Sequence, residues 1–310
     1  MRYPKFLKKN GKIGIIAPSF GCVGPYYGVR FDAAVKNLAG MGFNIEEGPN
    51  CRLDKGVGKS NTAVACAAEI NEFFLNNDCD VIISAAGGET MCEDVSFVDF
   101  EKIKNAPAKW FMGYSDNTNL TFTLATLCDT ASVYGPNATS FGMEKWHESL
   151  FDALKVLKGD SVKDDGTGLS FKNYDLWEKE GLANDLEPLL PLNVTEKSCI
   201  RSADAVPVKM SGRLLGGCLD CLVTLCGTKF DKVKEFNEKY ADDGIIWFLE
   251  SCDLNPIAVR RALWQMKNAG WFDKARGFII GRPFRYGEEC FDLSFDEAVK
   301  SMQSELKVPV

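Results

Sequence analysis

Residues 108–128, AKWFMGYSDNTNLTFTLATLC, decide the fold that this sequence predicts. The stretch begins with an apolar and aromatic run, Trp110–Tyr114, which is typical of a buried strand. Apolar residues then recur at helical spacing from Leu120 to Leu127, after Asp and Asn residues that favour the first turn of a helix. Ser115 therefore lies on a sharp turn between a strand and a helix.

A serine on such a turn has two interpretations. Its hydroxyl would project from the end of a sheet, and the amide of Asp116 would lie at a helix N-terminus, where unpaired N–H groups favour negative charge. This is the layout of a nucleophile elbow with one donor of an oxyanion hole. Gly113 relieves crowding under the turn, but Asn117 stands where the G-x-S-x-G pattern has its second glycine. The alternative is that Ser115 is a helix N-cap, and this stretch by itself favours the alternative.

Strands and helices alternate through the first half of the chain. The expected strands are Lys12–Pro18, Phe43–Glu46, Asp80–Ala86 and Trp110–Tyr114, followed by a further strand and loop over Val133–Phe141. The expected helices between and after them are Arg30–Met41, Thr62–Asn76 and Leu150–Leu157. This alternation predicts an α/β fold with a parallel, doubly wound sheet, in which ligands bind beyond the carboxyl ends of the strands.

The Gly87-Gly88 pair lies at that edge of the predicted sheet, as Ser115 does. Glycine lets a backbone amide approach a ligand closely, so the N–H of Gly88 is a candidate second oxyanion donor. The alternative is a plain tight turn. No G-x-G-x-x-G or P-loop spacing occurs, so the sequence gives a nucleotide cofactor no support.

The composition becomes polar, glycine-rich and acidic from residue 159 to residue 193, which indicates a linker. Trp177 stands alone in it, either as a surface on which a ligand stacks or as an anchor that packs the loop on the domain. We expect residues 1–160 to form an N-terminal domain that carries Ser115. Residues 161–205 would be a linker and substrate loop, and residues 206–310 a C-terminal domain.

The second half has its own strands and helices. The expected strands are Lys209–Leu214, Gly244–Glu250 and Phe278–Arg282, and the expected helices are Leu215–Cys226, Pro256–Ala269 and Phe295–Leu306. Glu250 ends a buried strand, where a carboxylate is costly unless it is solvated or paired. It could orient a catalytic base, or it could form a salt bridge with Arg260 or Arg261.

Composition excludes several classes of function. The formal net charge of −7 argues against a surface for nucleic acid or anionic membrane. No apolar run is long enough to span a membrane, and the N-terminal apolar run is too short for a signal peptide. Most of the 12 cysteines lie in apolar runs, which fits a reducing cytoplasm.

The C-x-x-C spacing of Cys218 and Cys221 lacks a second pair of metal ligands, so core packing is the favoured interpretation and no metal site is expected. A redox role for these thiols would require lowered pKa values. His147, the one histidine, is interpreted as an ordinary residue on a polar helix face.

Five short motifs occur in order along nearly the whole chain. They are Ile13–Ser19 (IGIIAPS), the Gly87-Gly88 loop, Gly113–Asp116 (GYSD), Gly212–Gly217 (GRLLGG) and Phe248–Glu250 (FLE). In these motifs the sequence resembles the LD-carboxypeptidase family of serine peptidases. The polar insert with Trp177 is most similar to the microcin C self-immunity (MccF-like) branch of that family.

The resemblance implies a flavodoxin-like N-terminal domain and a swivelling C-terminal β/α domain. It implies a Ser-Glu-His triad in which Ser115 is the nucleophile and Glu250 the acid, and an oxyanion hole made by the amides of Gly88 and Asp116. It implies no metal or organic cofactor and a homodimer. By family, the substrate is the L–D peptide bond of a murein tetrapeptide, or alternatively an aminoacyl or peptidyl nucleotide whose base stacks on Trp177.

The sequence departs from the family pattern at two places. The family histidine follows a strand near the C-terminus, and this chain stops at Val310, where Lys307–Val310 would open that strand. We expect a further C-terminal segment that carries the histidine. The alternative is a non-catalytic binding protein. In addition, Cys218 stands where an asparagine usually follows GRLLGG, which puts a polar substrate contact at Cys218 in doubt.

Overall fold

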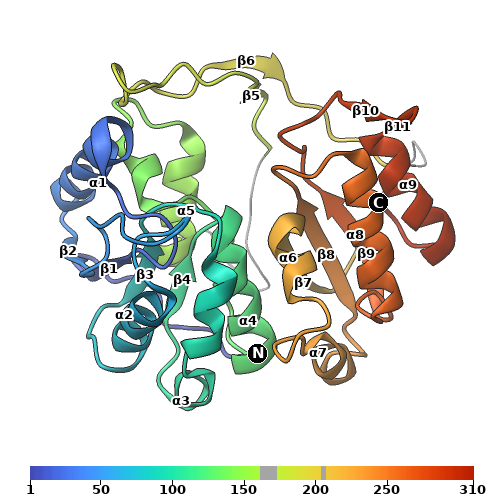
Figure 1. Ribbon diagram of the computed structural model, residues 1–310, viewed down its shortest axis with the longest axis horizontal. Coiled ribbons are helices and arrows are strands. Elements are labelled where there is room, and N and C mark those ends of the chain that lie inside the picture. The colour runs from blue at the N-terminus through green and yellow to red at the C-terminus, as the bar shows by residue number, and fades with distance from the viewer. Residues whose placement is uncertain (161–172, 204–206) are drawn as a thin grey trace. The chain divides into compact units, whose positions relative to one another are not determined.

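The computed structural model describes residues 1–160, 173–203 and 207–310 (Figure 1). The chain forms two compact units. The first comprises Met1–Asn117 and Thr130–Cys199, and the second comprises Thr118–Asp129 and Ile200–Val310. The expected boundaries after residues 160 and 205 fall on residues outside those described.

The first unit is built on a parallel sheet, four-stranded among the described residues, with the order β2-β1-β3-β4. Its strands are β1 (Lys12–Ile16), β2 (Asn44–Glu47), β3 (Val81–Ser84) and β4 (Trp110–Met112). All four were predicted, and β1, β3 and β4 are shorter than expected. Every residue of β3 and β4 is buried, as expected for a parallel sheet that is covered on both faces.

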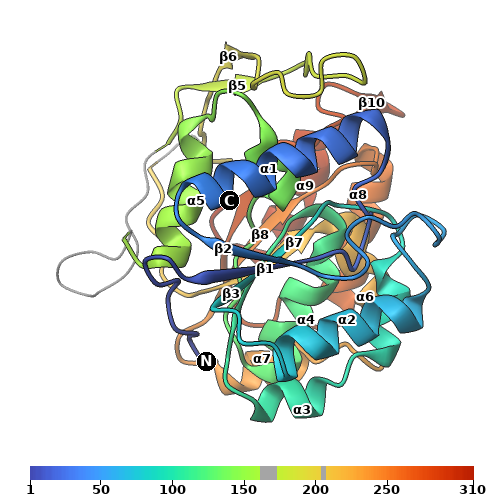
Figure 2. The ribbon, with the colours of Figure 1, turned by 90° about the vertical axis from the view of Figure 1, so that its left-hand side faces the viewer.

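Helices cover both faces of this sheet (Figure 2). Helices α1 (Val29–Gly40) and α5 (Glu148–Lys158) lie on one face, and α2 (Ala63–Leu75) and α3 (Phe100–Asn105) lie on the other. The alternation of side chains along β1 explains both layers, since Ile13 and Ile15 pack on the α1 face. Between them, Gly14 leaves room for α2, because a methyl group there would lie 2.7 Å from the Phe73 ring.

Two expectations for the first unit are wrong in part. Val133 forms only an isolated bridge with Met112, and the residues after it form a short helical turn, Ala138–Gly142, instead of a strand. Trp177 does not lie in an irregular loop. It belongs to β5 (Leu176–Glu178), which pairs antiparallel with β6 (Val194–Lys197). Local composition does not predict backbone hydrogen bonds between distant parts of the polar segment, such as those that pair β5 with β6.

The second unit has its own parallel sheet, three-stranded among the described residues, with the order β7-β8-β9. Its strands are β7 (Arg213–Cys218), β8 (Ile245–Glu250) and β9 (Ala275–Ile280), and a short hairpin joins β10 (Glu289–Cys290) to β11 (Leu293–Ser294). Its helices are α4 (Thr118–Cys128), α6 (Leu219–Leu225), α7 (Val233–Lys239), α8 (Pro256–Asn268) and α9 (Phe295–Leu306). The molecule is therefore an α/β protein with two separate parallel sheets.

The predicted boundary between the first strand and helix of this unit is wrong. Gly216 and Gly217 do not begin a helix but lie inside β7, with φ of 155° and 139°. Gly216 pairs with Phe248, and a methyl group on Gly216 would lie 1.8 Å from the Phe248 carbonyl oxygen. The glycines thus serve close backbone approach within a sheet, which a sequence pattern cannot distinguish from a loop.

The core of the second unit is aromatic. Phe122 of α4 stacks on Trp271 with ring centroids 5.1 Å apart, and Trp271 stacks on Trp247 of β8 at 5.7 Å. This packing joins α4 to the second unit although α4 lies in the first half of the sequence. At the other end of the chain, Lys307–Val310 is not a strand, but the Pro309 carbonyl accepts a hydrogen bond from the N–H of Phe278 in β9.

We predict that Glu69 makes folding stability depend on pH. This carboxyl group of α2 is 3% exposed and accepts hydrogen bonds from the N–H groups of Ala17 and Asn50, both at 2.8 Å. Burial raises its pKa to about 7. Because the folded pKa exceeds the unfolded value, the folded state holds the extra proton between about pH 4.5 and pH 7, so stability falls as pH rises through this window.

Urea unfolding of the wild type and Glu69→Gln at pH 5 and pH 8 measures this effect. The wild type should lose up to roughly 3 kcal/mol more than Glu69→Gln between the two conditions. Equal losses in the two proteins would contradict the assignment.

Candidate active site

Ser115 has a strained backbone. It lies three residues after β4, and its φ of +62° is in the left-handed region that residues other than glycine seldom adopt. Its N–H donates a hydrogen bond of 2.9 Å to the Tyr134 hydroxyl. An N-cap residue has extended backbone, so this φ favours the elbow over the cap. Strain of this kind costs about 1–3 kcal/mol and clusters at functional sites.

Gly113 and Asn117 make the turn possible. A methyl group on Gly113 would lie 2.9 Å from Cβ and Cγ of Asn117, so the space under the turn is filled by the asparagine. The Asn117 carboxamide is buried and donates to the carbonyl of Ala86 at 2.9 Å and to Oδ1 of Asn137 at 3.2 Å. The residue that replaces the second glycine of the elbow pattern therefore ties the turn to the end of β3.

The structure brings Ser115 and the Gly87-Gly88 loop together at the carboxyl ends of β3 and β4. A methyl group on Gly87 would lie 3.4 Å from Oγ of Ser115, so the Gly87 backbone lies against the serine side chain. A methyl group on Gly88 would lie only 2.0 Å from Oγ of Ser19. The parallel-sheet argument from the sequence predicted this proximity, but it assigned no role to Ser19.

Asp116 holds the neighbouring segments together through its side chain. Its carboxylate is 3% exposed and accepts hydrogen bonds from the Ser19 hydroxyl and from the N–H of Met91 at 3.0 Å. Sequence reasoning considered only the Asp116 backbone amide. The position of Ser19 just after β1 places it at the same edge of the sheet, and this position could have predicted its proximity to Asp116.

Glu250 lies at the end of β8 in the second unit. It is half-buried, its register partner on β7 is Cys218, and a methyl group on Gly281 would lie 2.9 Å from its Cβ.

Cys218 is a buried residue at the end of β7. Its N–H donates to Oγ1 of Thr118 at 3.0 Å, and its thiol lies 3.3 Å from a carboxylate oxygen of Asp220. The neighbouring Cys221 thiol and burial raise the pKa of Cys218 well above the usual value for a thiol. A redox cysteine needs the opposite shift, so this direction argues against a redox role for Cys218. Among the described residues, no group of His, Cys, Asp and Glu could hold a metal ion.

Two further candidates lie in the first unit. Trp177 is half-buried on β5, opposite Glu196 of β6. His147 is the N-cap of α5 and not a residue of the helix face as predicted. Its Nδ1 accepts a hydrogen bond from the N–H of Ser149 at 3.3 Å, and its ring meets the edge of Tyr174 with centroids 5.1 Å apart.

Family comparison agrees with the order of the motifs. Residues 13–135 match the LD-carboxypeptidase N-terminal domain, and residues 211–310 match the LD-carboxypeptidase C-terminal domain. The chain belongs to the LD-carboxypeptidase family. This is a family of peptidases, so the protein is a member of a hydrolase family.

A distantly related protein matches most of this chain. A Bacillus subtilis protein named "Probable murein peptide carboxypeptidase" is 26% identical over 280 residues, which are 89% of this chain and 73% of the relative.

Two kinds of solved structure share its fold. The microcin C7 self-immunity protein MccF is 23% identical, with a TM-score of 0.82 over 100% of this chain and 89% of that chain. A muramoyltetrapeptide carboxypeptidase from Oxalobacter formigenes is 21% identical, with a TM-score of 0.67 over 96% of this chain and 86% of that chain. One MccF structure contains aspartyl sulfamoyl adenosine. At these identities the likeness shows the fold alone.

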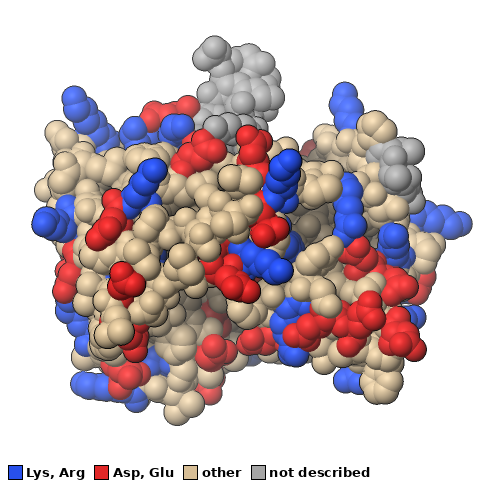
Figure 3. Space-filling view, turned by 90° about the horizontal axis from the view of Figure 1, so that it is seen from above, with Lys and Arg blue, Asp and Glu red and all other residues tan. Residues whose placement is uncertain are grey.

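Acidic and basic side chains are interspersed on the face in Figure 3, with no large area of basic residues alone. None of the helices that the structure describes has the length and apolarity needed to cross a bilayer.

We predict that Gly87 and Gly88 differ in their tolerance of a methyl group. Gly88→Ala should lower the free energy of unfolding by about 1–3 kcal/mol, because its Cβ would collide with Ser19 and force the loop to move. Gly87→Ala should cost less than about 1 kcal/mol, because its contact with Ser115 is an ordinary van der Waals distance. Urea unfolding measures both, and equal costs would contradict the packing described here.

Proposed function

We propose that this protein is a serine carboxypeptidase that hydrolyses the L–D peptide bond of murein-derived tetrapeptides. The observation that carries the proposal is the strained turn of Ser115, whose hydroxyl lies against the backbone of the Gly87-Gly88 loop. Membership of the LD-carboxypeptidase family supports it, as does the name of the Bacillus subtilis relative. A cytoplasmic location, inferred from the cysteine content, and a homodimer, implied by the family, stay predictions.

The proposed mechanism begins with attack by Oγ of Ser115 on the carbonyl carbon of the L–D bond. Negative charge then develops on the carbonyl oxygen, where the N–H groups of Gly88 and Asp116 would stabilise it. Collapse of this intermediate releases the terminal D-amino acid and leaves an acyl-enzyme. Water then attacks the ester and regenerates the Ser115 hydroxyl.

A base must take the proton of the Ser115 hydroxyl and deliver it to the leaving amine. The family resemblance assigns this role to a histidine oriented by Glu250. His147 is occupied in capping α5 and is not assigned this role.

The first test is Ser115→Ala, assayed by release of D-alanine from a murein tetrapeptide. We expect kcat/KM to fall by at least about 10³-fold, because removal of one triad member commonly costs several orders of magnitude. Ser301→Ala is a matched control, since that hydroxyl donates to the Ala298 carbonyl within α9.

Retention of activity in Ser115→Ala would sink the assignment of the nucleophile. Tight binding of the tetrapeptide without any hydrolysis by the wild type would instead favour the non-catalytic binding protein.

A second candidate is hydrolysis of an aminoacyl or peptidyl nucleotide. Two observations favour it, namely the MccF structures that contain aminoacyl sulfamoyl nucleosides and the position of Trp177 on the β5–β6 hairpin. In this version of the function the indole of Trp177 stacks on the base, while Ser115 performs the same attack.

Trp177→Ala separates the two candidates. Stacking of a base on an aromatic side chain contributes about 1–3 kcal/mol, so loss of the indole should raise KM for an aminoacyl nucleotide by roughly 5- to 150-fold. KM for the tetrapeptide should stay within about threefold, and Trp177→Phe should recover most of the loss. A uniform loss on both substrates would identify Trp177 as an anchor of the hairpin.

A further inference from the structure

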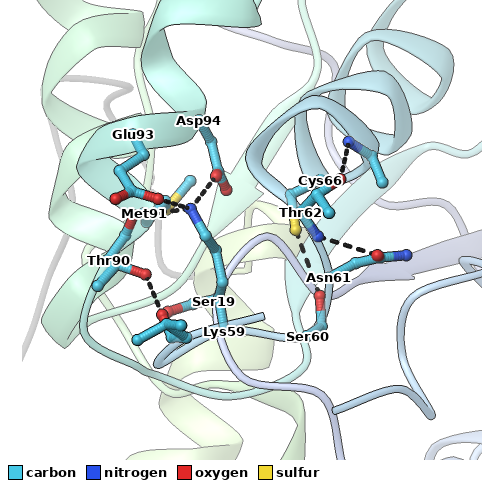
Figure 4. Close-up of polar contacts among 12 residues, drawn as sticks. Ser19, Lys59, Ser60, Asn61, Thr62, Cys66, Thr90, Met91, Glu93 and Asp94 are labelled. Atoms are coloured by element: carbon cyan, nitrogen blue, oxygen red, sulfur yellow. Dashed lines mark hydrogen bonds and ion pairs between the residues drawn. The ribbon is translucent and has the colours of Figure 1, made fainter. Parts of the chain in front are cut away.

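A buried lysine lies next to the Gly87-Gly88 loop. Lys59 is 3% exposed, and its Nζ donates hydrogen bonds to Glu93 and Asp94, both at 2.8 Å, and to the carbonyl of Thr90 at 3.1 Å. Figure 4 shows the ammonium group between the two carboxylates. Three acceptors thus match the three N–H bonds of the ammonium group.

Burial of the Lys59 ammonium group is costly, so its ion pair with Asp94 needs well-placed hydrogen bonds. Asp94 is fully buried, and a buried charge pair often stabilises less than apolar side chains of the same volume would. Burial opposes the charge on Lys59, but hydrogen bonds to Asp94 and Glu93 outweigh this and raise its pKa. Burial raises the pKa of Asp94 to about 7 in spite of the lysine. What such a pair does provide is directional contact.

The segment held by Lys59 begins two residues after Gly88. The same segment is joined to the turn before Lys59 by two further hydrogen bonds. The N–H of Glu89 donates to the carbonyl of Gly58 at 3.0 Å, and the Thr90 hydroxyl donates to the carbonyl of Val57 at 2.6 Å. Residues 57–59 therefore contact residues 89–94 through both backbone and charge.

We propose that Lys59 is a positioning residue that sets the direction of the Gly88 N–H by holding Thr90, Glu93 and Asp94 against residues 57–59. The inference rests on the proposed function, in which the Gly88 N–H stabilises the oxyanion. A displacement of the loop by about 1 Å would misdirect that N–H and slow the chemical step. All three donors of Lys59 are used within the protein, so its effect on the reaction is indirect.

Lys59→Met tests the proposal, because it removes the charge and keeps a long side chain. We expect kcat to fall by about 10- to 100-fold, while KM for the tetrapeptide changes by less than about threefold. Lys109→Met is the matched control. Lys109 is a half-buried lysine whose Nζ donates to the carbonyls of Phe73 and Asn77, so its loss should leave kcat within about twofold.

A second variant separates positioning from stability. Lys59→Met combined with Asp94→Leu removes both buried charges, and its melting temperature should recover relative to Lys59→Met. Its kcat should remain low, because Thr90 and Glu93 still lack their donor. Lys59→Arg keeps the charge and should recover part of kcat. Recovery of full kcat in the Lys59→Met/Asp94→Leu variant would assign Lys59 a purely structural role and overturn the proposal.

Amide hydrogen exchange gives a readout that does not depend on hydrolysis. In Lys59→Met, the amides of residues 86–95 should exchange at least about tenfold faster, while those of β1 and β3 stay as in the wild type. If the wild type does not hydrolyse any tetrapeptide or nucleotide, the proposed function fails, and exchange still decides whether Lys59 holds the loop. Unchanged exchange, or unchanged kcat in a folded Lys59→Met protein, would overturn the proposal.

Discussion

The buried carboxylate of Asp116 is the interaction on which the candidate site depends. It accepts hydrogen bonds from the hydroxyl of Ser19 and from the N–H of Met91. Ser19 follows β1, Met91 follows β3 and Asp116 follows β4, so one side chain joins the ends of three neighbouring strands. A buried carboxylate without hydrogen-bond donors is costly, so separation of these segments would destabilise the fold. The strained backbone of Ser115, one residue earlier, is therefore held by its surroundings and not by its own preference.

The loop beside Ser115 is shaped by excluded volume on one side and by charge on the other. Gly87 lies against the serine and Gly88 against Ser19, at distances that leave no room for a side chain at Gly88. After these glycines, hydrogen bonds from Lys59 hold the next part of the chain at Thr90 and Asp94. Packing sets how close the backbone comes to Ser115, while the charged contacts set the direction in which the loop leaves it.

The helix after Ser115 belongs to a different unit from the strand before it. Phe122 of α4 stacks on Trp271 in the second unit, and the Thr118 hydroxyl accepts a hydrogen bond from the N–H of Cys218. The chain thus passes from the first unit to the second immediately after Asn117. Glu250, which the family resemblance assigns to the triad, ends the strand that pairs with Cys218.

The sequence by itself determined the features that depend on neighbours along the chain. Apolar runs and helical spacing predicted the four strands of the first sheet and the turn at Ser115, because these signals are local. Only the tertiary structure decided that Gly216 lies inside a strand, that Trp177 lies on a hairpin, and which side chains surround the turn. The partners of Asp116 and Lys59 are separated from them by tens of residues, and such pairs form only when the sheet brings strand ends together. Local periodicity contains no information on such contacts. The strands and the turn could therefore be predicted, but the side chains that support Ser115 could not.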